Sequence, residues 1–306
     1  MTWLNQFVSL MKVSKDARDA NLSDTFIGRV LAKVEEVGAN GIDVVIVVPD
    51  RKSTALGRRW IDAGRKRGLK IWIRLAGKSF EKDKDNPHGL YGAPLLKSPD
   101  GLRHLKIHSD WISENRDLLL PETILTTEGE PQNGGILGIN RGKSDFYQFS
   151  SKEDFNEWLR LDIQTTKLAL KAAGCDGVQT GWYGFDGFIG WGNDNPDWTG
   201  KSFIEPQTME MMDSTLCIDH YPQKETMAKD LDDLRKVWPN TSVVIGEMGA
   251  THGETPEQLR QILEACKRPY ISTLNYWTMI GGNSALITQD FKNTQYFDVV
   301  KSFFKN

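Results

Sequence analysis

The chain has 306 residues and a formal net charge of −3, with acidic and basic side chains interspersed along its length. It therefore lacks the concentrated positive charge that binding to nucleic acid or to an anionic membrane surface requires, and no apolar run approaches the roughly 20 residues of a membrane span. This length suits one large domain or two ordinary ones, with room for a sizeable core.

Three cysteines, Cys175, Cys217 and Cys266, lie far apart and form neither a C-x-x-C pattern nor an even-numbered disulfide framework. We expect them to be reduced and buried. The first twenty residues have no basic start and no small-residue cleavage site. We therefore expect a soluble chain, either cytoplasmic or secreted after loss of a signal peptide. The sequence makes no prediction of oligomeric state.

The predicted elements begin with a strand, FVSLMKV, over residues 7–13. The next strand, GIDVVIVVP over 41–49, is too continuously apolar to have one wet face, so we expect it to be buried on both faces, as in a parallel sheet. A basic amphipathic helix over 54–68 and a strand, LKIWIRLA, over 69–76 complete a β-α-β unit. The polar stretch 78–101 is expected to be a long loop on the active face.

The alternation continues to the end of the chain. Further helices are predicted over about 102–115, 151–174, 224–238, 255–267 and 291–304, and further strands before Thr126 and in CDGVQTGWYG, DSTLCIDHYP, TSVVIGEMG and YISTLNYW. Strict alternation favours an open doubly wound sheet or a closed barrel. The open sheet calls for a G-x-G-x-x-G loop after the first strand, and none is present. We therefore predict an α/β fold, a (β/α)8 TIM barrel that forms a single domain over residues 1–306.

Polar and aromatic side chains cluster at the predicted strand ends, where such a barrel builds its active site. They are Arg74, Glu128, Glu130, Trp182, Tyr183, His220, Tyr221, Glu247 and Trp277. Glu130 and Glu247 come from opposite walls and could face each other across a bound sugar. Acetal cleavage needs a proton donor and a carboxylate that stabilises or traps the oxocarbenium-like carbon. A gap of about 5 Å would give retention, and one of about 6.5–9.5 Å inversion.

Three short motifs, in this order, resemble those of clan A glycoside hydrolases. GEPQN resembles the Asn-Glu-Pro motif at strand four, DHYP the His-Tyr signature at strand six, and IGEMG the strand-seven nucleophile. The resemblance implies that Glu130 is the general acid/base and Glu247 the nucleophile. It also implies that His220 and Tyr221 orient the nucleophile and that Trp277 forms the indole floor beneath the reacting sugar.

Two further positions are interpreted through this resemblance. Arg74 resembles the arginine that holds the nucleophile ionised, which in the family usually lies on strand two. Gly129 replaces the asparagine that contacts the sugar 2-hydroxyl. This departure leaves recognition of that hydroxyl open and is compatible with a 2-substituted or unusual sugar. We also expect Asn133 to contact the substrate.

Two alternatives concern individual residues. Glu128 competes with Glu130 for the acid role, since residues two apart on a strand share a side. We favour Glu130 because proline follows it and because of the family match. The segment from Trp182 to Trp198 holds six aromatic residues among glycines and polar residues, which suits a sugar-stacking platform. Trp182, Trp191 and Trp198 are expected to be its exposed members, whereas ordinary packing is expected of the helical tryptophans Trp60, Trp111, Trp158 and Trp238.

The sequence thus predicts a retaining glycoside hydrolase that acts on an oligo- or polysaccharide by double displacement and needs no cofactor or metal. Hydrolysis and transglycosylation both remain open. A carbohydrate-binding barrel with weak or no turnover is the first alternative. The second is a metal-dependent barrel hydrolase of amides or esters, with Asp219, His220 and His252 as candidate ligands. No H-x-H or H-E-x-x-H spacing accompanies these residues.

Overall fold

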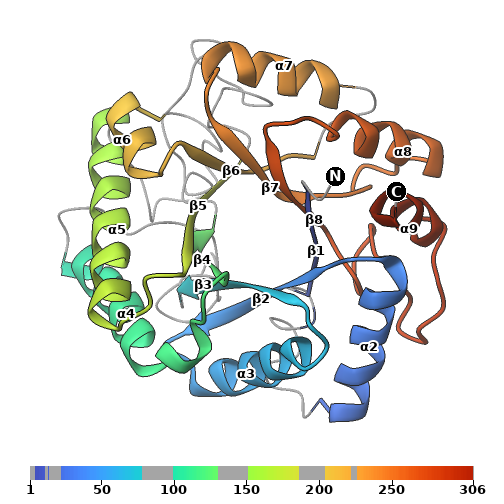
Figure 1. The fold of residues 1–306 in the computed structure, drawn as a ribbon, viewed down its shortest axis with the longest axis horizontal. Helices are drawn as coiled ribbons and strands as arrows, with labels where there is room; N and C mark the ends of the chain where they lie inside the picture. The colour runs from blue at the N-terminus through green and yellow to red at the C-terminus, as the bar shows by residue number, and fades with distance from the viewer. Residues whose placement is uncertain are drawn as a thin grey trace.

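The computed structural model describes most of the chain as one closed barrel. The described residues are 4–10, 13, 22–77, 99–129, 151–185, 204–221 and 226–305. Eight parallel strands follow one another around the ring in chain order, and β1 pairs with β8 to close it (Figure 1). The predicted (β/α)8 fold is therefore confirmed.

The strands alternate with helices that surround the ring (Figure 1). The strands are β1 (Asn5–Ser9), β2 (Gly41–Val48), β3 (Lys70–Gly77), β4 (Ile124–Gly129), β5 (Gln179–Phe185), β6 (Thr215–Asp219), β7 (Ser242–Met248) and β8 (Ile271–Tyr276). The helices are α2 (Asp24–Val37), α3 (Arg51–Arg65), α4 (Pro99–Glu114), α5 (Lys152–Ala172), α6 (Pro206–Met211), α7 (Met227–Val237), α8 (Pro256–Ala265) and α9 (Phe297–Lys305), with a short 3-10 helix, η2 (Arg116–Leu118). Within the described residues no helix is both long and apolar enough to cross a bilayer.

Helix boundaries follow local capping chemistry. Helix α3 begins at Arg51, three residues before the predicted start, because the Asp50 carboxylate accepts hydrogen bonds from the backbone N–H groups of Lys52 and Ser53. Helix α8 begins where predicted, at a reciprocal capping box between Thr255 and Gln258. Helix α9 begins six residues later than predicted. Phe291, the predicted first residue, has a φ of 65°, which a right-handed helix does not accommodate.

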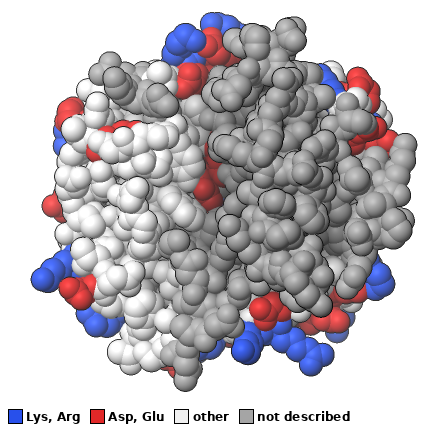
Figure 2. All heavy atoms as spheres, turned by 180° about the vertical axis from the view of Figure 1, so that it is seen from behind, with Lys and Arg blue, Asp and Glu red and all other residues white. Residues whose placement is uncertain are grey.

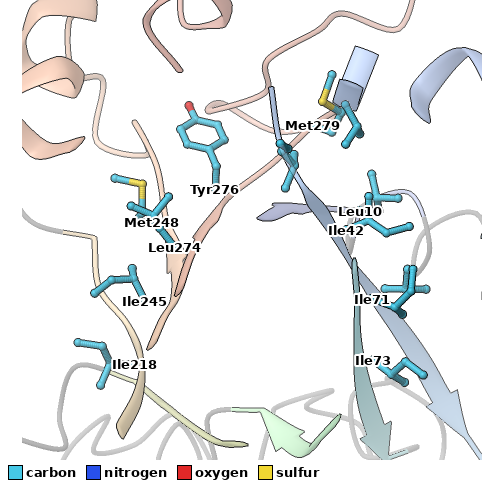
Figure 3. Packing of buried hydrophobic residues seen from close by; sticks show 14 of the residues in the cluster. Leu10, Ile42, Ile71, Ile73, Ile218, Ile245, Met248, Leu274, Tyr276 and Met279 are labelled. Carbon is cyan, nitrogen blue, oxygen red and sulfur yellow. The ribbon is translucent and has the colours of Figure 1, made fainter. Parts of the chain in front are cut away.

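Side-chain alternation on the strands separates two apolar layers. Outward-facing residues pack against the helices in one large core, which includes Ile42, Ile71, Ile73, Ile218, Ile245 and Leu274 (Figure 3). Inward-facing Phe7, Trp72, Ile124 and Cys217 fill the interior of the barrel, with the rings of Phe7 and Trp72 edge to face at 5.9 Å. Strand β2 lies between both layers, so all eight of its residues are buried, as its apolar sequence predicts.

The predicted packing residues are also largely where the sequence placed them. Trp60, Trp111 and Trp158 are buried on the helices, and Trp238 packs against the same core. All three cysteines are free and buried. Burial raises the pKa of the Cys266 thiol to about 12 and also raises the pKa of Cys217. These thiols are therefore packing groups at neutral pH.

Candidate active site

Inward-facing polar residues share the interior of the barrel with the inner apolar layer: Asp43 pairs in register with Trp72, and Glu247 lies near the carboxyl end of β7. Because inward and outward positions alternate, the outward Ile71, Ile73 and Leu75 place Arg74 inside the barrel. Asp43 is likewise flanked by the outward Ile42 and Val44. These interior charges are buried, which requires that they be paired with one another.

Both carboxylate oxygens of Glu247 are held by donors from elsewhere in the barrel, one on β3 and one just after β6. Arg74 donates from Nη1 to Oε1 at 2.8 Å, and the Tyr221 hydroxyl donates to Oε2 at 2.5 Å. Arg74 also donates from Nη2 to the carbonyl of Gly246 at 2.6 Å, so the guanidinium contacts both the side chain and the backbone of β7. Glu247 is 8% exposed. Its carboxylate is therefore fixed in orientation at the edge of the interior.

A second carboxylate shares the same guanidinium. Asp43 Oδ2 lies 2.8 Å from Arg74 Nη2 and also accepts a hydrogen bond of 2.8 Å from Asn275 Nδ2. Asn275 donates from the same nitrogen to the Gly246 carbonyl at 2.8 Å. Burial raises the pKa of Asp43 to about 6, against the opposing effects of Arg74 and Asn275. Below, these four side chains, Asp43, Arg74, Glu247 and Asn275, are called the interior network.

The interior network contains two carboxyl groups and one guanidinium. One guanidinium faces two carboxylates, so the set is net negative when both carboxylates are ionised. The Arg74 guanidinium also lies 4.9 Å from the centre of the Trp72 ring, whose π face favours a cation. On the side of the molecule opposite to the view of Figure 1, acidic side-chain atoms are visible near the centre of the face (Figure 2).

The two members of the strand-six signature take different positions. Tyr221 contacts Glu247 directly, whereas the His220 ring lies with Nε2 2.9 Å from Asp230 Oδ2 on α7. The backbone N–H of His220 donates to the Glu247 carbonyl at 2.9 Å as part of the β6–β7 pairing. His220 thus contacts Glu247 through its main chain and α7 through its ring.

Trp277 follows β8 and is half-buried beside the strand that carries Glu247. Its backbone N–H donates to the Met248 carbonyl at 2.8 Å. Its own carbonyl comes so close to Gly249 that a Cβ added there would lie 2.3 Å from the oxygen and 2.4 Å from Ser284 Oγ. Only glycine fits between these groups, so the chain just after Glu247 is tightly packed against the end of β8.

The exposure predicted for Trp182 is wrong. This residue is 2% exposed and belongs to the outer core, and its Nε1 donates to Asp162 Oδ2 on α5 at 3.1 Å. Thr127 Oγ1 on β4 donates to the same oxygen at 2.8 Å. Strand β5 extends to Phe185, so Trp182 is a strand residue whose side chain faces the helices, and it cannot stack on a sugar from that position.

For several of the predicted site residues the structure gives no side-chain position. Glu130, Asn133, Trp191 and Trp198 lie outside the described residues. Gly129 is paired with Tyr183 in the β4–β5 ladder, which puts residue 129 at the carboxyl end of β4. For Glu128 and Tyr183 only the main chain is described. The roles predicted for these residues stay predictions.

Two residues of the interior network, Asp43 and Asn275, were not among the predicted site residues. Asp43 was included in an apolar strand, and Asn275 in the last strand. A carboxylate inside a run expected to be buried on both faces was the signal that could have identified Asp43, because an unpaired charge there would be very costly.

The candidate metal ligands do not converge. Within the described residues no group of three or more His, Cys, Asp or Glu side chains is arranged to hold a metal ion. His220 faces Asp230, and His252 Nδ1 lies 3.5 Å from Glu254 Oε1. The two histidines therefore take part in separate carboxylate pairs.

By sequence, no protein-family model and no curated protein matches the chain. By structure, it is similar to GH5_18 from Streptomyces cattleya in complex with GlcNAc, at 12% identity and a TM-score of 0.70, over 100% of this chain and 80% of the other. It is also similar to the exo-β-1,4-mannosidase Op5Man5 from Opitutaceae bacterium strain TAV5, at 13% identity and a TM-score of 0.65, over 98% and 58% of the two chains.

A third similar structure is the β-glucuronidase of Bacteroides uniformis, at 12% identity and a TM-score of 0.67. The match covers 99% of this chain but 35% of the other, so this chain corresponds to about a third of that enzyme's length. The chain has the barrel fold of these glycoside hydrolases. At such low identity the likeness concerns the fold, and the activity has to be argued from the site.

Proposed function

We propose that the protein is a retaining glycoside hydrolase of the clan A type, with Glu247 as nucleophile and Glu130 as general acid/base. The observation that carries this proposal is the double anchoring of Glu247, one oxygen by the Arg74 guanidinium and the other by the Tyr221 hydroxyl. A carboxylate fixed at the carboxyl end of a barrel strand is what attack on an anomeric carbon requires.

The reaction would proceed in two steps. In the first, Glu130 gives its proton to the glycosidic oxygen while a Glu247 oxygen forms an ester bond to the anomeric carbon, and the aglycone leaves as an alcohol. In the second, Glu130 accepts a proton from water, whose oxygen bonds to the anomeric carbon, and Glu247 is released as a carboxylate. A sugar hydroxyl in place of water would give transglycosylation.

The substrate class is proposed from the fold neighbours and from Gly129. Their names refer to GlcNAc, β-1,4-mannosides and β-glucuronides, so β-linked pyranosides are the first candidates. Glycine where the family has asparagine removes a side chain that would contact the 2-hydroxyl. Sugars with a 2-acetamido group or an axial 2-hydroxyl are therefore the members of this class to test first.

The test is a panel of 4-nitrophenyl β-glycosides (N-acetylglucosaminide, mannoside, glucuronide and glucoside) assayed with wild type and single variants. Glu247→Ala should abolish turnover, and azide should restore it with a glycosyl azide of inverted configuration. Glu130→Ala should be rescued by azide with retained configuration, whereas Glu128→Ala, its matched control, should keep most of the activity. Product stereochemistry is read by ¹H NMR.

Tyr221→Phe tests the anchoring separately from the nucleophile itself. Loss of one hydrogen bond to a charged group predicts a decrease in kcat/KM of about 10- to 100-fold, with the fold unchanged. Full activity in Glu247→Ala would refute the proposal. If no glycoside is cleaved but oligosaccharides still bind, a carbohydrate-binding barrel replaces it.

A further inference from the structure

A buried carboxylate in the barrel interior has no role in the mechanism above. Asp43 is fully buried on β2, and its Oδ2 contacts Arg74 and Asn275. An apolar residue would suit this strand better, because a buried carboxyl group is costly even when paired. The contacts nevertheless direct Asp43 to one partner in particular, the guanidinium that holds Glu247.

The geometry makes Arg74 a shared cation. Nη1 contacts Glu247, and Nη2 contacts both Asp43 and the Gly246 carbonyl, at 2.6–2.8 Å in each case. Asp43 therefore holds the guanidinium at Nη2, while Nη1 holds the proposed nucleophile, Glu247. Asn275, which bonds to Asp43 and Gly246 together, ties this arrangement to the backbone of β7.

We propose, building on the proposed function, that Asp43 is a positioning residue of the reaction: it aims the Arg74 guanidinium at Glu247 and, through its own charge, sets how much of that positive charge Glu247 receives. When Asp43 is protonated, Arg74 is paired with Glu247 alone. When Asp43 is ionised, two carboxylates share one cation, and the additional negative charge stabilises the oxocarbenium-like transition state. Ionised Asp43 also leaves Glu247 less neutralised and hence more nucleophilic.

The groups that face Asp43 come from the strands around the interior. Among the residues that the structure describes, the titratable ones are Arg74 on β3, Cys217 on β6 and Glu247 on β7, and the polar ones are Ser9 on β1 and Asn275 on β8. The Cys217 thiol is neutral at working pH and Arg74 is always charged. Because burial places the pKa of Asp43 at about 6, its charge changes within the pH range of an ordinary assay.

The kinetic test compares wild type with Asp43→Asn, which keeps an acceptor for Arg74 but cannot ionise. We expect equal kcat/KM within about twofold below pH 5, where wild-type Asp43 is protonated, and a wild-type advantage of about three- to tenfold above pH 7. Asp43→Ala should lower kcat at every pH, with Asp43→Asn restoring the low-pH activity. A wild-type to Asp43→Asn ratio that is constant with pH would overturn the proposal.

The matched control is Asp162→Asn, another buried aspartate, which binds Thr127 and Trp182 on the outer side of the barrel. This variant should change activity by a factor that does not vary with pH. If it reproduces the profile of Asp43→Asn, the effect is a general one of losing a buried carboxylate and the proposal falls.

A readout without turnover separates this proposal from the proposed function. With ¹³C-carboxyl glutamate, the Glu247 resonance, assigned by its loss in Glu247→Gln, should show a step near pH 6 in wild type that is missing in Asp43→Asn. If wild type cleaves no glycoside but the step is present, the proposed function fails and the charge coupling stands. If glycosides are cleaved and the step is absent, the coupling fails and the function stands.

Discussion

Replacing Arg74 by methionine should lower the free energy of unfolding much more at neutral pH than at acidic pH. The side chain of Arg74 is 5% exposed and lies between Asp43 and Glu247, whose side chains are 0% and 10% exposed. Methionine fills similar space but leaves two buried carboxylates facing each other without a cation. Removal of one partner from a buried ion pair costs about 3–5 kcal/mol. We expect a loss in the free energy of unfolding of at least this size at pH 7.5.

The pH dependence identifies the cause. Without Arg74, the pKa of Asp43 should rise further, because this cation opposes the effect of burial. At pH 5 Asp43 is then protonated and no longer needs the cation, so the decrease in the free energy of unfolding should be smaller by about half or more. Urea unfolding of wild type and variant at both pH values measures it. Arg65→Met is the matched control, because Arg65 donates to the neutral Leu118 carbonyl and Thr123 hydroxyl. A loss for Arg74→Met that is equal at both pH values, or that the control reproduces, would refute the reasoning.

Two more predictions concern residues close to Glu247. Burial raises the pKa of Asp43 from an ordinary 3.8 to about 6, so the folded chain holds this proton more tightly than the unfolded chain does. The stability of wild type relative to Asp43→Asn, measured by urea unfolding, should therefore fall by up to about 3 kcal/mol as the pH rises from 4 to 7. A stability difference that does not change with pH contradicts this. Gly249→Ala should cost about 1–3 kcal/mol and lower kcat, because its Cβ would collide with the Trp277 carbonyl. Gly28→Ala, where nothing comes closer than 3.9 Å, should instead raise the melting temperature, and equal effects of the two would contradict the packing argument.

The fold was predictable because buried parallel strands and amphipathic helices leave strong periodic signals. Strand β2 was identified from its apolar run, and its complete burial follows from lying between the interior layer and the helices. The start of α3 was misplaced because apolar periodicity begins later than the cap, and the hydrogen bonds to Asp50 decide where the helix begins.

The site was predictable only where alternation or a motif applied. Arg74 could be found from its position among isoleucines, and the structure brings it against Glu247. Trp182 was misassigned because its glycine-rich surroundings suggest a loop, whereas the strand continues through it and turns its indole toward α5. Asp43 was missed because the apolar residues around it predict a buried strand without a functional role. Its pairing with Arg74 and Asn275 depends on closure of the barrel, which no local pattern encodes.

The hydrogen bond from Asn275 to Asp43 joins residues 232 positions apart, and the bond from Arg74 to Glu247 joins residues 173 apart. Contacts of such long range form late, because the entropy of closing the intervening chain has to be overcome first. A folding intermediate with only its first strands and helices in place would have much of a core but no anchored Glu247. In refolding, turnover should therefore return after the helical signal, so that activity reports completion of the ring.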